Sequence, residues 1–213
     1  MNENSRVALF FTNTWVVKSM DAILNRITSF LANNDNIDEE RLEVIRYGIE
    51  ILLLKVLFFI ASMLVGVLLH SFWECLLFTL SFSAIRSMAG GYHADTRTKC
   101  FIQSMFMLIL VLAILKLIQG NLLGCAIVIG LSIVAAVIIW LTSPIDTANK
   151  RLTNEERKIL KIKSRLILII ETVICISTYL LNYGKVAYSI MAALISTAVL
   201  LIIGGLKSTK QIS

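Results

Sequence analysis

A histidine and a cysteine seven residues apart are the side chains of this sequence best suited to covalent chemistry. They are His93 and Cys100, within the segment Arg86-Ser-Met-Ala-Gly-Gly-Tyr-His-Ala-Asp-Thr-Arg-Thr-Lys-Cys100. A cysteine thiolate is a strong nucleophile, and an imidazole close to it in the fold can accept the thiol proton. Cations at positions 97 and 99 favour the thiolate form. The pair is therefore a candidate nucleophile and base.

This spacing requires the chain to bend between the two side chains. On a straight helix, an offset of seven residues leaves them on one face but about 10.5 Å apart, too far for a hydrogen bond. The Gly-Gly pair at 90–91 permits backbone conformations that other residues avoid. Asp95 or Thr96 can cap a following helix, which would leave Cys100 near the positive N-terminal end of that helix. An ordinary helix–loop–helix turn fits the composition equally well, because a Gly-Gly pair marks a turn in any protein.

The other cysteines do not indicate a metal site or a disulfide framework. Cys75, Cys125 and Cys175 lie in apolar segments, where cysteine behaves as a small hydrophobic residue. The chain has two histidines, no Cys-x-x-Cys pair and no His-Glu-x-x-His motif. We therefore expect no metal, no cofactor and free thiols.

The composition is that of an integral membrane protein. Of 213 residues, 57% are apolar and 16% are charged, with a mean hydropathy of +0.82. Soluble domains are about 45–50% apolar and about 25% charged. One proline and ten glycines exclude collagen-like, proline-rich and disordered classes. The net charge of +6 is attributed to cation-rich cytoplasmic loops, and no nucleic-acid partner is expected.

Six apolar segments have the length of membrane-spanning helices, for which about 17–25 residues are needed. They are Ile51–Leu69, Phe72–Ala89, Phe101–Ile118, Leu122–Leu141, Leu166–Tyr183 and Val186–Leu206. Short links at 70–71, 119–121 and 184–185 group them into three helical hairpins. The second segment has the weakest signal, because it carries Glu74 and Arg86. The predicted fold is all-α, with six transmembrane helices.

The cations predict the orientation. Seventeen lysines and arginines fall on one side of this arrangement, and Lys185 alone falls on the other. The cation-rich side is cytoplasmic, so both termini and both longer loops face the cytosol. The basic stretch 150–165 either determines this topology alone or also suits an acidic peptide.

The region before the first span predicts a helix that lies in the membrane interface. From Val7 to Leu31, apolar residues recur at helical spacing between charged ones. A cleaved signal peptide is disfavoured, because an acidic run and no small-residue cleavage pattern follow. Residues 1–213 are predicted to form one membrane domain. It comprises a cytoplasmic or interfacial region 1–47, a six-helix core 48–206 and a cytoplasmic tail 207–213.

Glu50 has two interpretations. If the first hairpin turns near 70–71, Glu50 lies level with Gly91, because both helices rise about 1.5 Å per residue. It could then neutralise Arg86 or Lys55, or orient His93. Alternatively, it is solvated at the headgroup boundary, where a charge costs much less than at the bilayer centre. Glu171 is structural or of unknown role.

The segment from Arg86 to Cys100 resembles the corresponding part of the accessory gene regulator B (AgrB) family of bacterial quorum-sensing membrane peptidases. That family has an Arg, a Gly-Gly-x-His and a Cys seven residues after the His, here Arg86, Gly90, Gly91, His93 and Cys100. Two further patches resemble the family, and the resemblance covers nearly the whole chain. These patches are Tyr47–Glu50 and a loop segment with Pro144, Asp146, Asn149 and Lys150.

The resemblance implies a cysteine endopeptidase in the cell membrane of a bacterium. Its substrate would be a short AgrD-type precursor peptide, cleaved on the cytosolic side. Cys100 would attack the scissile carbonyl and His93 would transfer the proton, giving a thioester that an internal Cys or Ser resolves into a thiolactone or lactone ring. Arg86, Gly91 and Glu50 would contact the substrate or the oxyanion. The secondary site residues would be Gly90, Pro144, Asp146, Asn149 and Lys150, and the partners are the precursor, the lipid bilayer and, as a candidate, a second copy of the chain.

A small transporter or permease is the alternative, with Glu50, Lys55 and Glu171 along its path. Two features oppose it. The polar residues cluster at the cytosolic end, and no pair of broken helices carries charge at the midplane.

Overall fold

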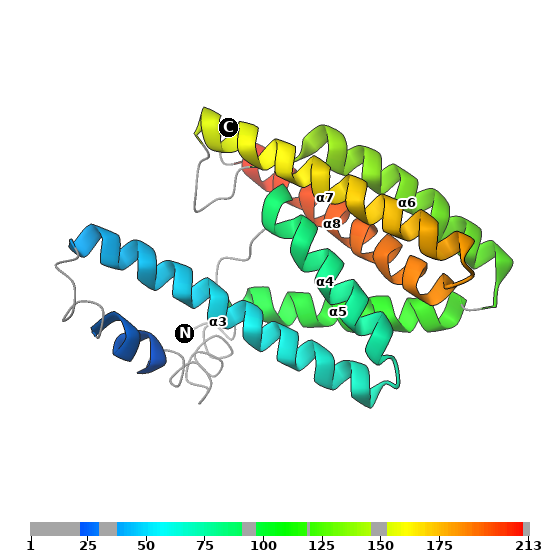
Figure 1. Ribbon diagram of the computed structural model, residues 1–213, viewed down its shortest axis with the longest axis horizontal. Helices are drawn as coiled ribbons and strands as arrows, with labels where there is room; N and C mark the ends of the chain where they lie inside the picture. Colours follow the sequence, from blue (N-terminus) through cyan, green and yellow to red (C-terminus); the bar gives the residue numbers. More distant parts are fainter. Residues whose placement is uncertain (1–21, 30–37, 91–96, 119, 146–152, 211–213) are drawn as a thin grey trace.

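The computed structural model describes residues 22–29, 38–90, 97–118, 120–145 and 153–210 (Figure 1). This part of the chain is all-α apart from turns and one isolated backbone bridge. It contains a short helical segment at 22–29 and six long helices. The long helices are α3 (Glu39–Leu68), α4 (Phe72–Ala89), α5 (Arg97–Ile118), α6 (Leu122–Thr142), α7 (Asn154–Leu180) and α8 (Gly184–Lys210).

Each of the six apolar segments predicted from the sequence lies almost entirely within one of these helices. The short links join α3 to α4, α5 to α6 and α7 to α8, at the positions predicted from the sequence. Two helices begin well before their apolar segments. The first turn of α7 is held by a capping box, in which Thr153 and Glu156 each bond the other's backbone N–H. Of the predicted interfacial helix, residues 22–29 are helical and the rest lies outside the described residues.

Four helices are long and apolar enough to cross a membrane: Arg41–Leu68, Cys100–Ile118, Leu122–Thr142 and Gly184–Leu206. The chain is therefore a polytopic membrane protein. Among the described residues, α4 and α7 do not meet this criterion, so four of the six predicted spans qualify by length and composition. The reason is charge, because α4 carries Glu74 and Arg86 and the first half of α7 is basic.

Helix α8 forms the centre of the bundle. In its apolar window 67% of the residues are buried inside the protein, against 11% for α3. Helices α4, α6 and α7 pack around it. Its buried face is rich in small residues, which let neighbouring helices approach closely, namely Ala187, Ser189, Ala192, Ala193, Ser196, Thr197 and Ala198.

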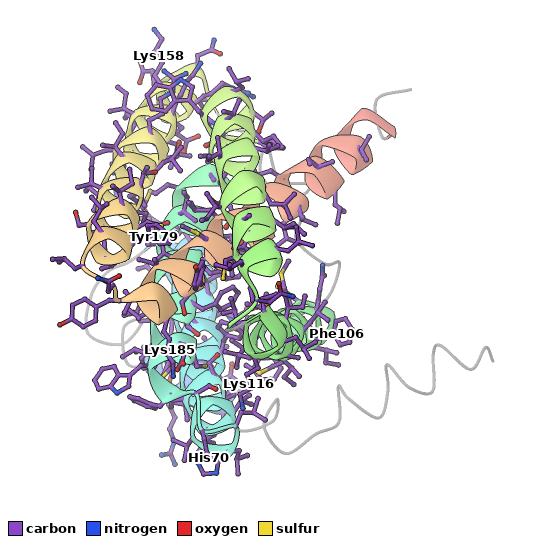
Figure 2. All side chains as sticks on the ribbon, turned by 90° about the vertical axis from the view of Figure 1, so that its right-hand side faces the viewer. His70, Phe106, Lys116, Lys158, Tyr179 and Lys185 are labelled. Atoms are coloured by element: carbon purple, nitrogen blue, oxygen red, sulfur yellow. The ribbon has the colours of Figure 1, made fainter. Side chains whose placement is uncertain are left out.

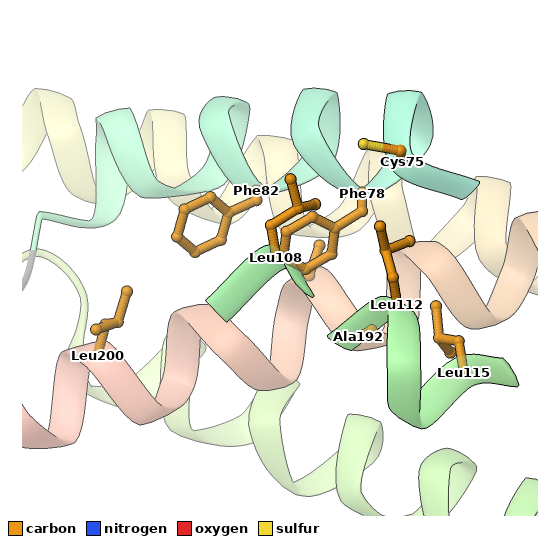
Figure 3. Packing of buried hydrophobic residues seen from close by; sticks show 9 residues of the cluster. Cys75, Phe78, Phe82, Leu108, Leu112, Leu115, Ala192 and Leu200 are labelled. Atoms are coloured by element: carbon orange, nitrogen blue, oxygen red, sulfur yellow. The ribbon is translucent and has the colours of Figure 1, made fainter. Parts of the chain in front are cut away.

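Helix α4 lies against α8 and also contacts α3 and α5, so it connects these two helices to the centre of the bundle. Figure 3 shows Phe78 and Phe82 of α4 in one buried cluster with Leu108 of α5 and Leu200 of α8. The two phenyl rings are stacked, with centroids 5.5 Å apart. A second cluster joins the last turns of α4 to α6, α7 and α8 through Ile85, Ala89, Ala135, Ile139, Leu168, Leu194, Ala198 and Leu201. The C-terminal end of α4 is therefore held by three other helices.

At the opposite end of the bundle, two lysines form contacts between helices. The Lys116 ammonium donates to the Leu69 carbonyl at the end of α3. Lys185 forms an ion pair with Glu74, with an N···O distance of 3.7 Å. Figure 2 shows Lys116 and Lys185 toward the end that carries His70, and Lys158 at the other end.

Candidate active site

The last turn of α4 carries Arg86 and ends in a glycine that adopts a left-handed conformation. The N–H of Gly90 donates to the Arg86 carbonyl over 3.1 Å, which caps the helix. Its φ is +73°, a region that residues with a Cβ rarely adopt. The Gly-Gly pair therefore ends α4 where the sequence predicted a bend. Because Gly90 departs from the helical conformation, a single straight helix through positions 86–100 is excluded.

Gly90 also contacts the segment that follows α6. Gly90 and Ile145 form a parallel backbone bridge, in which the Ile145 N–H donates to the Ala89 carbonyl over 3.1 Å. A Cβ added to Gly90 would lie 2.5 Å from the Ile145 carbonyl oxygen. Both the backbone conformation and this close approach thus require glycine at position 90.

This bridge brings together two segments that the sequence analysis singled out separately. One begins at Arg86 and the other at Pro144, and the two are far apart along the chain. Pro144 is buried, as is Ser143 before it. The Ser143 hydroxyl donates to the Ser164 hydroxyl of α7 over 2.7 Å, and Ser164 donates to the Lys161 carbonyl over 3.1 Å. The loop after α6 is thereby attached to both α4 and α7.

Cys100 lies in the first turns of α5, as predicted, and is half-buried. The guanidinium of Arg86 interacts electrostatically with this cysteine. Arg86 is itself half-buried, and its guanidinium carbon lies 5.6 Å from the centroid of the Phe82 ring. Helices α4 and α5 therefore bring a cation within electrostatic range of the candidate nucleophile, and the partly apolar setting strengthens the attraction of this cation for negative charge.

A family model, "Accessory gene regulator B", matches residues 24–203. The chain belongs to the AgrB family. It is 30% identical to an AgrB-like protein of Clostridium perfringens (strain 13 / Type A), over 73% of this chain and 83% of the relative. It is 28% identical to accessory gene regulator protein B of Staphylococcus saprophyticus, over 70% of this chain and 77% of the relative.

Another AgrB-like protein of the same Clostridium perfringens strain is 26% identical over 65% of this chain and 67% of its own length. No solved structure matches the chain. The resemblance inferred from the sequence is thus confirmed at the level of the AgrB family. The matched range contains all the candidate site residues, including Arg86, Cys100 and Pro144.

Several predicted site residues of this AgrB family member lie outside the described residues. They are Gly91, His93, Asp146, Asn149 and Lys150. Glu50 is half-buried on α3, and its contact with Arg86, Lys55 or His93 stays a prediction. Within the described ranges, no group of three or more His, Cys, Asp or Glu side chains is arranged to hold a metal ion.

Sequence reasoning missed Ser143 and Ser164. Ser164 begins a buried stripe of α7 that continues through Leu168, Glu171 and Cys175 at helical spacing. This periodicity is visible in the sequence and would have marked position 164 as facing the protein. The partner of Ser164 could not be read from the sequence, because Ser143 belongs to the end of another helix.

Proposed function

We propose that this member of the AgrB family is a membrane-embedded cysteine endopeptidase that cleaves a short AgrD-type precursor peptide on the cytosolic side. The observation that carries the proposal is the electrostatic interaction of Arg86, on the last turn of α4, with Cys100, in the first turn of α5. A half-buried cysteine at a helix N-terminus and next to a cation has the surroundings of a nucleophilic thiol. His93 lies between the two in the sequence and is the proposed base.

The first step forms a bond between the Cys100 sulfur and the scissile carbonyl carbon. The thiol proton passes to His93, and the carbonyl oxygen becomes an oxyanion. Collapse of this intermediate breaks the C–N bond, and His93 returns the proton to the leaving amine. The N-terminal part of the peptide remains on Cys100 as a thioester.

The second step releases the enzyme. A Cys thiol or Ser hydroxyl within the bound peptide attacks the thioester carbonyl, so that the Cys100 thiol leaves and a thiolactone or lactone ring closes. Water would compete for the same carbonyl, and a partly buried junction disfavours it. The cyclic product would be the quorum-sensing signal.

Arg86 is proposed to stabilise the oxyanion or to bind an acidic part of the precursor. A guanidinium can do either because it carries a permanent charge and several N–H donors. Gly91 and Glu50 are proposed substrate contacts, and the segment with Asp146, Asn149 and Lys150 is proposed to border the site. The bridge between Gly90 and Ile145 supports this last assignment.

We further propose that all six helices cross the membrane, with both termini in the cytosol and residues 1–213 forming one domain. Helix α4 packs along the buried face of α8, with Phe78, Phe82 and Leu200 in one cluster and Ile85 and Leu201 in the next. Because α8 has the length and composition of a span, α4 beside it lies at the same depth. Helix α7 runs back along α8 in the same way. The bilayer is therefore a partner, and a homodimer remains a proposal.

The transporter alternative has less support. Lys55 is exposed on the peripheral helix α3, whereas Glu171 is buried on α7. Helix α4 packs against both helices and lies between them (Figure 1). Among the described residues, α4 therefore separates the helix that carries Lys55 from the helix that carries Glu171.

The proposed function is tested by cleavage of an AgrD-type precursor in proteoliposomes. The Cys100→Ala and His93→Ala variants are expected to lose cleavage, whereas Cys125→Ala, a half-buried cysteine of α6, is expected to retain it. Cleavage at the wild-type rate by Cys100→Ala would overturn the proposal. Peptide flux that persists in the same variant would favour transport.

A further inference from the structure

Two buried serines join the loop after α6 to helix α7. Ser143 is 4% exposed and Ser164 is 1% exposed. The Ser143 hydroxyl donates to Ser164 over 2.7 Å, and Ser164 in turn donates to the Lys161 carbonyl over 3.1 Å. Both hydroxyls are thus satisfied inside the protein, in a chain of hydrogen bonds that ends on the backbone of α7.

This arrangement differs from that of other helical hydroxyls in the bundle. Thr172, Ser177 and Ser189 each donate to the carbonyl four residues earlier in their own helix. Such bonds satisfy the hydroxyl but connect nothing. The Ser143–Ser164 bond instead connects two separate elements, and neither side chain can find water in this buried setting if the other is removed.

The connection continues to the candidate active site. Ser143 is two residues before Ile145, whose N–H donates to the Ala89 carbonyl at the end of α4. Hydrogen bonds and covalent bonds therefore lead from Ser164 through the 143–145 segment to Gly90. His93 follows Gly90 by three residues, and a chain of that length spans at most about 11 Å. The position of Gly90 thus limits where the proposed base can lie.

We propose that Ser143 and Ser164 are positioning residues for peptide cleavage, which hold the 143–145 segment against Gly90 and so fix the point from which the chain continues to His93. This proposal rests on the proposed endopeptidase function. Neither serine needs to touch the substrate. Their loss should impair the alignment of base and nucleophile, and thus the turnover number, more than the binding of the precursor.

The expected effects follow from the energetics of one buried hydrogen bond. Ser143→Ala and Ser164→Ala should each lower kcat by about threefold to tenfold, since a net bond of roughly 1 kcal/mol corresponds to a factor of about five. KM for the precursor should change by less than about twofold. The double variant should be no worse than the poorer single variant, because both substitutions remove the same interaction.

The experiment measures kcat and KM for precursor cleavage in proteoliposomes, per folded molecule. Ser177→Ala on α7 is the matched control, because its hydroxyl bonds only its own helix, and it should match the wild type. Ser164→Thr, which keeps the hydroxyl, should retain most of kcat. If Ser164→Ala yields no folded protein, Ser164→Cys takes its place and should give an intermediate kcat.

Two results would overturn the proposal. One is a wild-type kcat in both single alanine variants, and the other is a double variant whose loss is the product of the two single losses. Cleavage by Cys100→Ala in the same assay would show instead that the proposed function is wrong. A Cys100→Ala variant without activity, together with fully active serine variants, would reject the positioning role alone.

Discussion

Gly90 and Ile145 pair their backbones although one ends α4 and the other follows α6. The Ile145 carbonyl oxygen occupies the space that a Cβ at position 90 would need, 2.5 Å from it. This bridge closes the cytosol-facing end of the bundle in the proposed topology. It brings the Arg86–Cys100 pair and the Pro144 segment to one place.

Gly90→Ala should therefore damage both the structure and the activity. The substitution adds a clash with backbone and a strained φ, at a cost of about 1–3 kcal/mol. Precursor cleavage should fall about tenfold or more, with a lower temperature of thermal unfolding in detergent. Gly130→Ala is the control, because nothing lies within 4 Å of a Cβ there and alanine favours a helix. A Gly90→Ala variant equal to the wild type in both measurements would contradict the observed bridge.

Arg86→Gln should slow the reaction of Cys100 with iodoacetamide. Arg86 interacts electrostatically with Cys100, and this substitution removes its positive charge. We expect the rate of this reaction to decrease roughly threefold to tenfold at fixed pH, which corresponds to the loss of about 1 kcal/mol of electrostatic attraction. The rate for Arg86→Lys should lie between those of the wild type and Arg86→Gln. The rate is followed by mass spectrometry of the peptide that contains Cys100, and an unchanged rate in Arg86→Gln would refute the electrostatic contact.

Glu171→Leu should stabilise the protein and leave cleavage intact. Glu171 is 6% exposed on α7, and its Oε2 atom finds no hydrogen-bond partner among the described residues. Removing a buried group of this kind is expected to raise the free energy of unfolding by about 1–3 kcal/mol. Glu74→Leu is the contrasting variant, because it breaks the ion pair with Lys185 and should give no gain. Loss of cleavage in a well-folded Glu171→Leu protein would assign Glu171 a function and revive the transporter alternative.

Single cysteines in a background without the four native ones should reveal the topology. His70→Cys, Asn121→Cys and Asn182→Cys stand at the three hairpin turns and should react with a membrane-impermeant maleimide in intact cells. Thr153→Cys, before α7, should react only after permeabilisation. If α4 did not cross the membrane, positions 70 and 121 would lie on opposite sides, and labelling of only one of them would reject six crossings.

The sequence predicts most of the helical framework because apolar blocks and short polar links are local signals. The sequence also predicts the bend. Helix α4 ends at Ala89, directly before the Gly-Gly pair, and α5 begins at Arg97. The two charged residues that weakened α4 as a span are explained only by the structure. Arg86 faces Phe82 and Cys100, and Glu74 pairs with Lys185, so both charges are turned toward protein.

Other features depend on contacts between distant parts of the chain. The bridge from Gly90 to Ile145 and the hydrogen bond from Ser143 to Ser164 join elements whose proximity no local pattern encodes. Family resemblance marked Pro144, but it did not indicate that this segment touches the end of α4. Packing around α8 decides that contact, and packing is a property of the whole bundle.

The central claim is that Cys100 carries the peptide as a thioester. It is tested most directly by incubating the protein with a precursor whose ring-forming Cys or Ser is replaced by Ala, followed by mass spectrometry of the intact protein and its peptides. Because no internal nucleophile can then resolve the intermediate, we expect the N-terminal fragment to accumulate on Cys100 and hydroxylamine to release it. Cleavage of this precursor with the adduct on another residue would contradict the account.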